Sequence, residues 1–187
     1  MKLPTNVKKI LKTIRQAGHS AYAVGGCVRD SLLGVTPNDW DLCTSATPRE
    51  IMDIFEGGFK IVPSGIEFGT VTILIESSPY EITTYRVDGN YGDNRRPDGV
   101  NFTKSLAEDL SRRDFTINAM AFNDDGLTDL FGGKADLEAG IVRCVGDPNK
   151  RFAEDALRML RAIRFAARFN FIIDSDTKEA INENSKL

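Results

Sequence analysis

Short apolar runs alternate with amphipathic stretches over most of the chain. Residues 4–17 carry apolar side chains three or four positions apart, which predicts a helix that ends near Gly18. Runs rich in branched and aromatic residues predict strands at 21–24, 38–43, 59–62, 70–76, 81–86, 120–123, 127–129 and 141–145. Ser-Ser-Pro separates 70–76 from 81–86, so we expect these two strands to form a hairpin.

Capping signals mark the starts of further helices. Thr47 and Glu50 have the spacing of a capping box, and Ser105 and Glu108 repeat it. With the glycines that end each segment, the pattern predicts helices at 28–33 and 48–55, a short helix from 105 into 112, and a helical turn between 133 and 137. Residues 88–100 have no periodicity and carry three glycines, which predicts a mobile loop.

The character of the chain changes after residue 146. Residues 152–169 predict one long helix with two distinct faces. Its apolar face carries Leu157, Leu160, Ile163 and Ala167, and its basic face carries Arg158, Arg161, Arg164 and Arg168. A last helix is expected from residue 174 onwards. We therefore expect two domains, 1–147 and 148–187, the second being the opening of a helical domain.

Composition and charge narrow the class of protein. With 187 residues, of which 41% are hydrophobic and 27% charged, the chain resembles an ordinary globular protein. No apolar run approaches the roughly 20 residues of a membrane span, and the Lys-rich N-terminus lacks the apolar core of a signal peptide. We therefore expect a cytoplasmic protein with no membrane partner. A net charge of −3 argues against indiscriminate coating of nucleic acid.

The cysteines and the single histidine argue against several kinds of site. Cys27, Cys43 and Cys144 are odd in number and widely spaced, which predicts reduced thiols rather than disulfides or a zinc site. His19 is the only histidine, so a histidine general base or a histidine metal cluster is not expected. Acidic and basic side chains are left as the candidates for chemistry.

Two carboxylates stand one residue apart in the segment Asn-Asp-Trp-Asp-Leu. Side chains alternate along an extended chain, so Asp39 and Asp41 are expected on one face, where they can bind a single divalent cation. An isolated pair of this kind is also common as surface carboxylates of a turn. A phosphatase of the haloacid dehalogenase type would have a continuous apolar strand before it, and a calcium loop would have oxygen ligands after Asp41. Neither is present.

A glycine pair precedes the two acids. Gly25 and Gly26 permit close approach of the backbone to a bulky anion, and Arg29, one helical turn later, can neutralise it. Alone, such a pair is more often a tight turn, and it matches neither a dinucleotide fingerprint nor a P-loop. Glycines, arginine and acids together are typical of a metal-assisted phosphoryl transferase.

Several further residues are candidates that each have a structural alternative. Glu81 opens a strand and is the best third acid for a metal site, or else an exposed glutamate of an edge strand. Arg112, Arg113 and Asp114 can face a nucleotide, or else form a solvated helix end. Asp155 and Arg158 stand close enough on a helix to match the polar edge of a base, although an arginine stripe is usually the wet face of a helix.

These stretches together resemble the class II tRNA nucleotidyltransferases, or CCA-adding enzymes, and the related bacterial poly(A) polymerases. The matching stretches lie between about residues 21 and 170, in the order that the family uses. They are Val24-Gly25-Gly26-Cys27-Val28-Arg29-Asp30, Asp39-Trp40-Asp41-Leu42, Gly69-Thr70-Val71-Thr72, Glu81-Ile82-Thr83-Thr84-Tyr85-Arg86, Arg112-Arg113-Asp114-Phe115-Thr116-Ile117-Asn118-Ala119-Met120-Ala121 and Arg151-Phe152-Ala153-Glu154-Asp155-Ala156-Leu157-Arg158-Met159-Leu160-Arg161-Ala162.

The resemblance implies an α+β fold, with a mixed five-stranded nucleotidyltransferase head and flanking helices followed by the start of an all-α neck. It implies that Asp39 and Asp41 hold two Mg²⁺ ions, with Glu81 as a third ligand, for attack of a tRNA 3′ end on the α-phosphate of CTP or ATP. The nucleotide-binding residues it implies are Gly25, Gly26, Arg29, Arg112, Arg113, Asp114, Asn118, Asp155, Arg158, Arg161 and Arg164.

Two features bear on the choice within this group. Pro63 to Val71 is more similar to the CCA-adding pattern, although Phe68 stands where the family often has histidine. Arg95 and Arg96 leave the loop 88–100 similar to CCA- or A-adding members. The alternatives are a poly(A) polymerase or A-adding enzyme, and a non-catalytic module that binds nucleotide or RNA.

Overall fold

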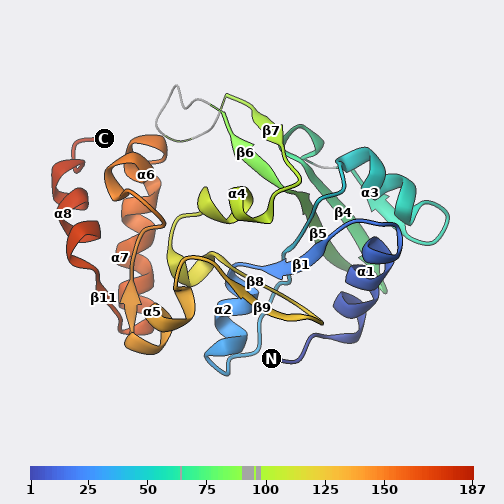
Figure 1. Cartoon of the computed structure of the whole chain (residues 1–187), viewed down its shortest axis with the longest axis horizontal. Coiled ribbons are helices and arrows are strands. Elements are labelled where there is room, and N and C mark those ends of the chain that lie inside the picture. The colour runs from blue at the N-terminus through green and yellow to red at the C-terminus, as the bar shows by residue number, and fades with distance from the viewer. Residues whose placement is uncertain (64, 90–94, 96–97) are drawn as a thin grey trace.

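A computed structural model of the chain describes residues 1–63, 65–89, 95 and 98–187. A mixed β-sheet crosses the middle of the molecule, and the C-terminal helices gather at one end of it (Figure 1). The N-terminal helix and the strands at the opposite edge form the other end. The functional cavity described below lies between the sheet and the C-terminal helices.

The central sheet has seven strands among the described residues. In spatial order they are β3 (Lys60–Val62), β4 (Thr70–Ile75), β5 (Ser78–Thr84), β2 (Leu42–Thr44), β1 (Ala21–Val24), β8 (Met120–Asn123) and β9 (Gly126–Asp129). β2 and β5 are parallel and the other neighbours antiparallel, which confirms the mixed sheet and the hairpin β4–β5. The expected count of five was too low, because seven described strands pair in this sheet.

One face of the sheet carries the larger core. It is covered by α1 (Thr5–Gln16), α2 (Gly26–Leu32) and α3 (Pro48–Phe55), all three of which were predicted as helices. Thr47 and Glu50 form the predicted capping box at the start of α3. Side chains at alternate strand positions, such as Ala21 and Ala23 of β1, point into this layer and are fully buried.

The opposite face carries a smaller core beneath α4 (Leu106–Ser111). Its buried members are Val24, Cys43, Tyr85, Leu110 and Ala121. Because side chains alternate, a residue two positions before Cys43 points to this same face. The face with the thinner cover is therefore the one toward which Asp41 is directed.

The segment after β5 departs from the prediction. The expected strand 81–86 ends at Thr84, and a separate hairpin is formed by β6 (Arg86–Asp88) and β7 (Val100–Phe102). The loop expected at 88–100 connects these strands, and most of it, 90–94 and 96–97, lies outside the described residues.

The remaining elements are two short turns within the first 120 residues and the elements that follow β9. They are the short turns η1 (Ile66–Phe68) and η2 (Thr116–Asn118), then α5 (Gly133–Ala139), β10 (Ile141–Val142), α6 (Pro148–Glu154), α7 (Leu157–Phe169), β11 (Ile172–Ile173) and α8 (Ser175–Glu183). The strand expected at 141–145 is only two residues long and pairs in parallel with β11, away from the central sheet. Asp174 caps α8, so the last helix starts where it was expected.

The single helix expected at 152–169 is wrong. Asp147 accepts hydrogen bonds from the backbone N–H groups of Asn149 and Lys150, so α6 begins at Pro148. Asp155 then adopts an extended conformation, with φ −141° and ψ 99°, and ends α6. Its side chain accepts a hydrogen bond from the backbone N–H of Leu157 and thereby helps start α7.

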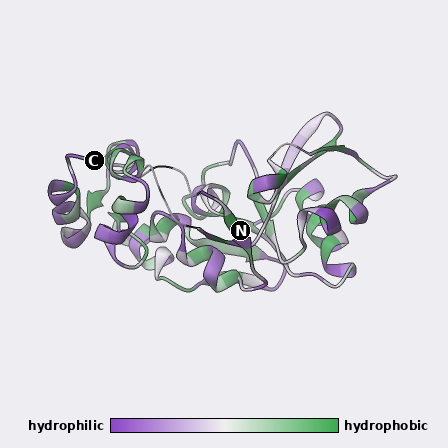
Figure 2. Cartoon of the chain, turned by 90° about the horizontal axis from the view of Figure 1, so that it is seen from above, coloured by the Kyte–Doolittle hydropathy of each residue, from purple (hydrophilic) through white to green (hydrophobic). Residues whose placement is uncertain are grey.

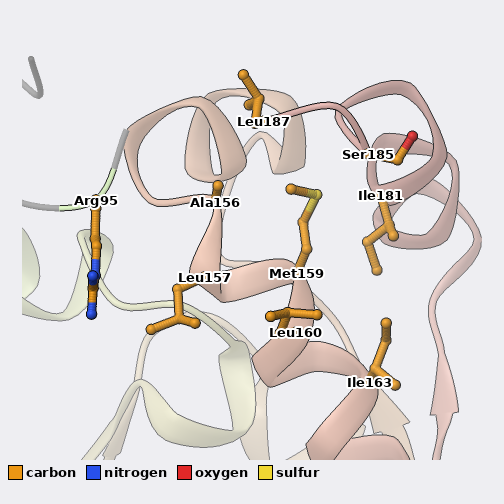
Figure 3. Close-up of a pocket in the computed structure, with 9 residues that line it drawn as sticks. All are labelled: Arg95, Ala156, Leu157, Met159, Leu160, Ile163, Ile181, Ser185 and Leu187. Carbon is orange, nitrogen blue, oxygen red and sulfur yellow. The ribbon is translucent and has the colours of Figure 1, made fainter. Parts of the chain in front are cut away.

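The side of α7 that packs on the rest of the chain also differs from expectation. Leu157, Leu160 and Ile163, predicted as its apolar face, are 44%, 64% and 49% exposed. α7 instead packs on the rest of the chain through a stripe that includes Met159, Ala162 and Phe165. The exposed leucines and Ile163, together with residues of α8 and the C-terminus, line an apolar groove of about 620 Å³ (Figure 3).

The distribution of hydropathy agrees with a sheet that is covered by helices. In Figure 2 hydrophobic and hydrophilic positions alternate around the outer helices, as expected of amphipathic elements. None of the helices in the described part of the chain is long and apolar enough to cross a membrane.

We predict that the three thiols are inert in the folded protein. Burial raises the pKa of Cys27 to about 11 and that of Cys144 to about 12, and it raises the pKa of Cys43 as well. At pH 8 a thiol reagent such as DTNB should react with none of them in native protein and with all three in denaturant. Rapid reaction of one thiol before unfolding would contradict this placement.

Candidate active site

A polar cavity of about 410 Å³ brings three distant segments together. They are the turn into α2 with the approach to β2, the segment from Arg113 to Asn118, and α7. The lining residues are Gly25, Gly26, Arg29, Asp39, Asp41, Arg113, Asp114, Asn118, Arg161, Arg164, Phe165 and Arg168. Most of the residues singled out from the sequence therefore lie around one space.

The glycine pair forms a sharp turn at one wall of the cavity. Gly25 has φ +78° and ψ −130°, a conformation that side chains with a Cβ rarely adopt. A Cβ at Gly25 would also lie 3.2 Å from Nη1 of Arg113. The absence of a side chain thus keeps this wall open and lets a guanidinium approach the backbone.

Arg29 is held rigidly although it faces the cavity. Its guanidinium pairs with Asp30 at 2.7 Å and donates to the side-chain oxygen of Asn118. It also lies 5.1 Å from the ring centre of Phe165 and 4.8 Å from that of Phe169. Arg29 is only 4% exposed, so its position is fixed before any ligand binds.

Asp39 and Asp41 line the same cavity, as their spacing predicted. The expected strand 38–43 begins only at Leu42, but the backbone N–H of Val24 still donates to the carbonyl of Asp41 at 3.0 Å. Partial desolvation by the cavity walls raises the pKa of the Asp41 carboxyl. The charge of Arg113 opposes this rise, and the negative charge of Asp39 adds to it. A divalent cation would relieve this repulsion, and carboxylate oxygens are the ligands that Mg²⁺ prefers, so the pair fits such an ion.

The side chain of Glu81 does not join Asp39 and Asp41 as a third acid. Its residue position is favourable, because Leu42 pairs with Ile82 in parallel and Glu81 stands one residue before Ile82, as Asp41 does before Leu42. Its side chain is exposed, however, and across the described ranges no three His, Cys, Asp or Glu side chains gather closely enough to bind one metal. Metal binding by Glu81 remains a prediction.

The neighbouring arginines Arg112 and Arg113 point to different places. Arg113 lines the cavity with the acids, whereas Arg112 lines a separate polar cavity of about 190 Å³ beside Asp88 and Arg151. Both bind the carboxylate of Asp109. Only one of the two arginines therefore reaches the Asp39–Asp41 site.

Asp114 joins the head of the site to α7. Its Oδ2 accepts from Arg161 at 2.8 Å (Nε) and 2.6 Å (Nη2), and its Oδ1 accepts from the side-chain amide of Asn118 at 3.1 Å. Both oxygens are thus occupied in this conformation. Asp114 and Asn118 lie at the cavity as predicted, and the ion pair with Arg161 fixes α7 beside them.

Asp155 and Arg158 do not line this cavity. Asp155 caps α7, and Arg158 is buried, where it donates to Glu154 at 3.0 Å and to the carbonyl of Arg112 at 3.0 Å. Their predicted pairing as donor and acceptor for a base is not formed here, because both side chains are bound to other groups.

Two cavity residues were missed from the sequence. Phe165 contacts Arg161 and Arg164 with its ring, each guanidinium carbon 5.3 Å from the ring centre, and Arg168 lies 5.1 Å from the ring centre of Phe169. Phe165 was not singled out from the sequence, and Arg168 was assigned to an arginine stripe that is usually the wet face of a helix. The signal that could have found them is the i, i+4 spacing of Arg161, Phe165 and Phe169.

Comparison with known protein families adds an independent observation to this geometry. The family model described as the poly A polymerase head domain matches residues 21–143, which is more than half of the chain. The chain belongs to the poly A polymerase head domain family. The matched range contains the glycine turn, both acids and the segment from Arg112 to Asn118.

Members of this family in several bacteria are close in sequence and structure. The chain is 52% identical over 189 residues to the CCA-adding enzyme of Ligilactobacillus salivarius, covering 99% of this chain and 46% of that protein. The CCA-adding enzyme of Lactiplantibacillus plantarum is 52% identical over 181 residues, covering 96% and 44%. This head-domain chain therefore spans less than half the length of the curated relatives it matches.

Solved structures give the same result. The crystal structure of the Bacillus stearothermophilus CCA-adding enzyme in complex with CTP superimposes with a TM-score of 0.89 at 42% identity, covering all of this chain and 45% of that one. The Thermotoga maritima CCA-adding enzyme complexed with tRNA_CCA gives a TM-score of 0.77 at 29% identity, covering 97% and 41%. The expected family and fold class are confirmed.

Substitution of Gly25 tests the turn at the cavity wall. Gly25→Ala should lower the free energy of unfolding by about 1–3 kcal/mol, because alanine is strained at this positive φ and Arg113 has to move away from the new Cβ. Urea denaturation measures this loss. Gly34→Ala is the matched control, since Gly34 has φ +75° but no atom within 4 Å of an added Cβ. Equal losses in the two variants would show that contact with Arg113 contributes nothing.

The ion pair between Asp114 and Arg161 should show coupling. Arg161→Ala and Asp114→Asn should each reduce stability, and the double variant should lose less than the sum of the two, by about 0.5–3 kcal/mol. A double-mutant cycle in urea measures this difference. Strict additivity would show that α7 is held to Asp114 by other contacts.

Proposed function

We propose that this chain is the nucleotide-transferring part of a CCA-adding tRNA nucleotidyltransferase, which adds CMP and AMP from CTP and ATP to tRNA 3′ ends and releases pyrophosphate. The observation that carries the proposal is the single cavity in which Asp39 and Asp41 face a glycine turn and several arginines. The names of the relatives support the same activity, including solved complexes with CTP and tRNA.

Asp39 and Asp41 are the proposed catalytic residues and Mg²⁺ ligands. When bound there, Mg²⁺ would favour ionisation of the attacking 3′-hydroxyl and stabilise the charge that develops on pyrophosphate. The donor set is suited to it, because both groups are carboxylates and both reach the same solvent-accessible cavity. Glu81 is proposed as a further ligand, on the basis of its position in β5 beside β2.

The triphosphate is proposed to lie along the basic wall of the cavity. Arg29 and Arg113 flank the glycine turn, while Arg161 and Arg164 approach from α7. Guanidinium groups suit phosphate oxygens because their N–H donors form a planar fork. Gly25 and Gly26 would let the phosphates approach the backbone closely.

The sugar and base are proposed to contact the segment after Arg113 and the start of α7. Asn118 and Asp114 are proposed to meet the ribose, and a ribose hydroxyl would have to share or displace the contact of Asp114 with Arg161. Asp155 and Arg158 are proposed to select C and A by their base edges. For that role Arg158 has to exchange its bonds to Glu154 and the Arg112 carbonyl for the base.

We further infer that residues 1–147 form the catalytic head and 148–187 the opening of a helical neck. Since the curated relatives are about twice as long, tRNA binding by the whole protein is proposed to require chain beyond the part described here. Poly(A) synthesis is the second candidate, because the matching family model is named for that enzyme.

The products formed on RNA separate the two activities. The protein is incubated with Mg²⁺, tRNA that ends at the discriminator base, and CTP or ATP singly or together, and the 3′ ends are sequenced. CCA ends support the proposal, whereas long A-tails on unstructured RNA support poly(A) synthesis. Failure to incorporate either nucleotide in full-length protein would remove both.

We predict that Asp41→Asn abolishes transfer while leaving the fold intact. The raised pKa of Asp41 means that its charged form is disfavoured in the folded state, so Asn should leave the melting temperature equal or higher. Millimolar Mg²⁺ should raise the melting temperature of the wild type and change that of Asp41→Asn much less. An active Asp41→Asn enzyme would contradict the proposed role. Glu81→Gln, measured in parallel, tests the third ligand.

A further inference from the structure

Asp109 is a fully buried carboxylate that the proposed chemistry does not use. It lies in α4 on the thinly covered face of the sheet, and its side chain is 1% exposed. A charge in such a place is costly unless it is paired and hydrogen-bonded. Burial opposes its ionisation, yet Arg113 and Arg112 outweigh that effect, and the pKa of Asp109 is lowered. Asp109 is therefore an anion with two cations.

The two oxygens of Asp109 bind different partners. Oδ1 accepts from Arg112 Nε at 3.1 Å and Nη2 at 2.8 Å, and from the backbone N–H of Arg86 at 3.3 Å. Oδ2 accepts from Arg113 Nη2 at 3.1 Å. One oxygen thus serves local structure around α4 and β6, and the other serves a residue that lines the candidate active site.

Arg113 extends from Asp109 to the glycine turn. While Nη2 binds Asp109, Nη1 lies 3.2 Å from the position that a Cβ of Gly25 would occupy. Arg113 Nε is buried and has no hydrogen-bond partner among the residues described. Among the described residues, the hydrogen bond to Asp109 is the one side-chain hydrogen bond that orients the Arg113 guanidinium. Without it, the guanidinium could turn away from the cavity.

We propose that Asp109 is a positioning residue that holds Arg113 beside the Gly25 turn, where the second terminal nitrogen of Arg113 meets the triphosphate of the nucleotide. This inference rests on the function proposed above. Asp109 itself touches no substrate, and it acts only through Arg113. If Asp109 only supported the fold, its important contacts would be those of Oδ1 with Arg112 and the backbone of Arg86.

Binding of Mg²⁺–CTP by the chain, measured by titration calorimetry, tests the inference. Asp109→Asn should weaken binding about ten- to a hundredfold, the effect expected from loss of a hydrogen bond to a charged group. Asp109→Glu keeps the charge and protects the fold if Asn does not, and it too should bind more weakly, because the longer side chain displaces Arg113. Circular dichroism and melting temperature establish that each variant is folded.

A double-mutant cycle distinguishes positioning from general support of the fold. Arg113→Met should weaken binding, and adding Asp109→Asn to it should cause little further loss, because Asp109 then has no Arg113 to orient. Additive losses would overturn the inference. Inorganic tripolyphosphate serves as a second probe, since it has phosphates but no base, and its binding should follow the same order.

Asp136→Asn is the matched control. Asp136 is also a buried carboxylate bound to an arginine, Arg143, at 3.1 Å, but it does not line the cavity. This variant should lose stability and keep its affinity for CTP. Wild-type affinity in folded Asp109→Asn or Asp109→Glu overturns the inference alone. A full-length wild-type protein that binds no CTP overturns the proposed function, and the role of Asp109 with it.

Discussion

The cavity depends on holding several like charges close together. Five arginines line or enter one space of about 410 Å³, and their mutual repulsion has to be offset before any anion is bound. Three of them pair with carboxylates: Arg29 with Asp30, Arg113 with Asp109 and Arg161 with Asp114. The ring of Phe165 adds an aromatic surface for three of the arginines. The basic wall is therefore built in advance.

The sheet supplies the framework for this arrangement because its two faces are covered unequally. The three helices α1, α2 and α3 give one face a large apolar core, while the other face has mainly α4 and a few buried side chains. The thin cover leaves room at the strand ends for charged groups. Asp41 is directed to that face, and Arg113, which follows α4, lines the same cavity.

Local patterns predicted the parts of the fold that depend on neighbouring residues. The capping box at Thr47, the hairpin β4–β5 and the spacing of Asp39 and Asp41 each need only a few positions of sequence, and the structure has all three. The family resemblance then placed these parts in one known fold. Cavity residues from Gly25 to Asn118 followed from its motifs.

Features set by distant packing were not accessible in the same way. The apolar stripe of Leu157 and Leu160 looked like a core face, because the sequence does not say which side of α7 meets the rest of the chain. The break at Asp155 was missed because Asp147 and Pro148 start an earlier helix. Arg112 and Arg113 are neighbours in the sequence and both bind Asp109, and only the separate cavities that they line show which one faces the acids.

The short parallel pair β10–β11 has a consequence for how this protein can be divided. Its strands come from opposite sides of the expected boundary at 147, and backbone N–H groups of Ile172 and Asp174 donate to the carbonyls of Gly140 and Val142. Proteolysis or truncation at that boundary would strip these carbonyls of their partners and uncover Phe115, which packs edge-on against Phe165. Residues 1–147 and 148–187 should therefore not be expressed separately, because we expect them to fold as one cooperative unit.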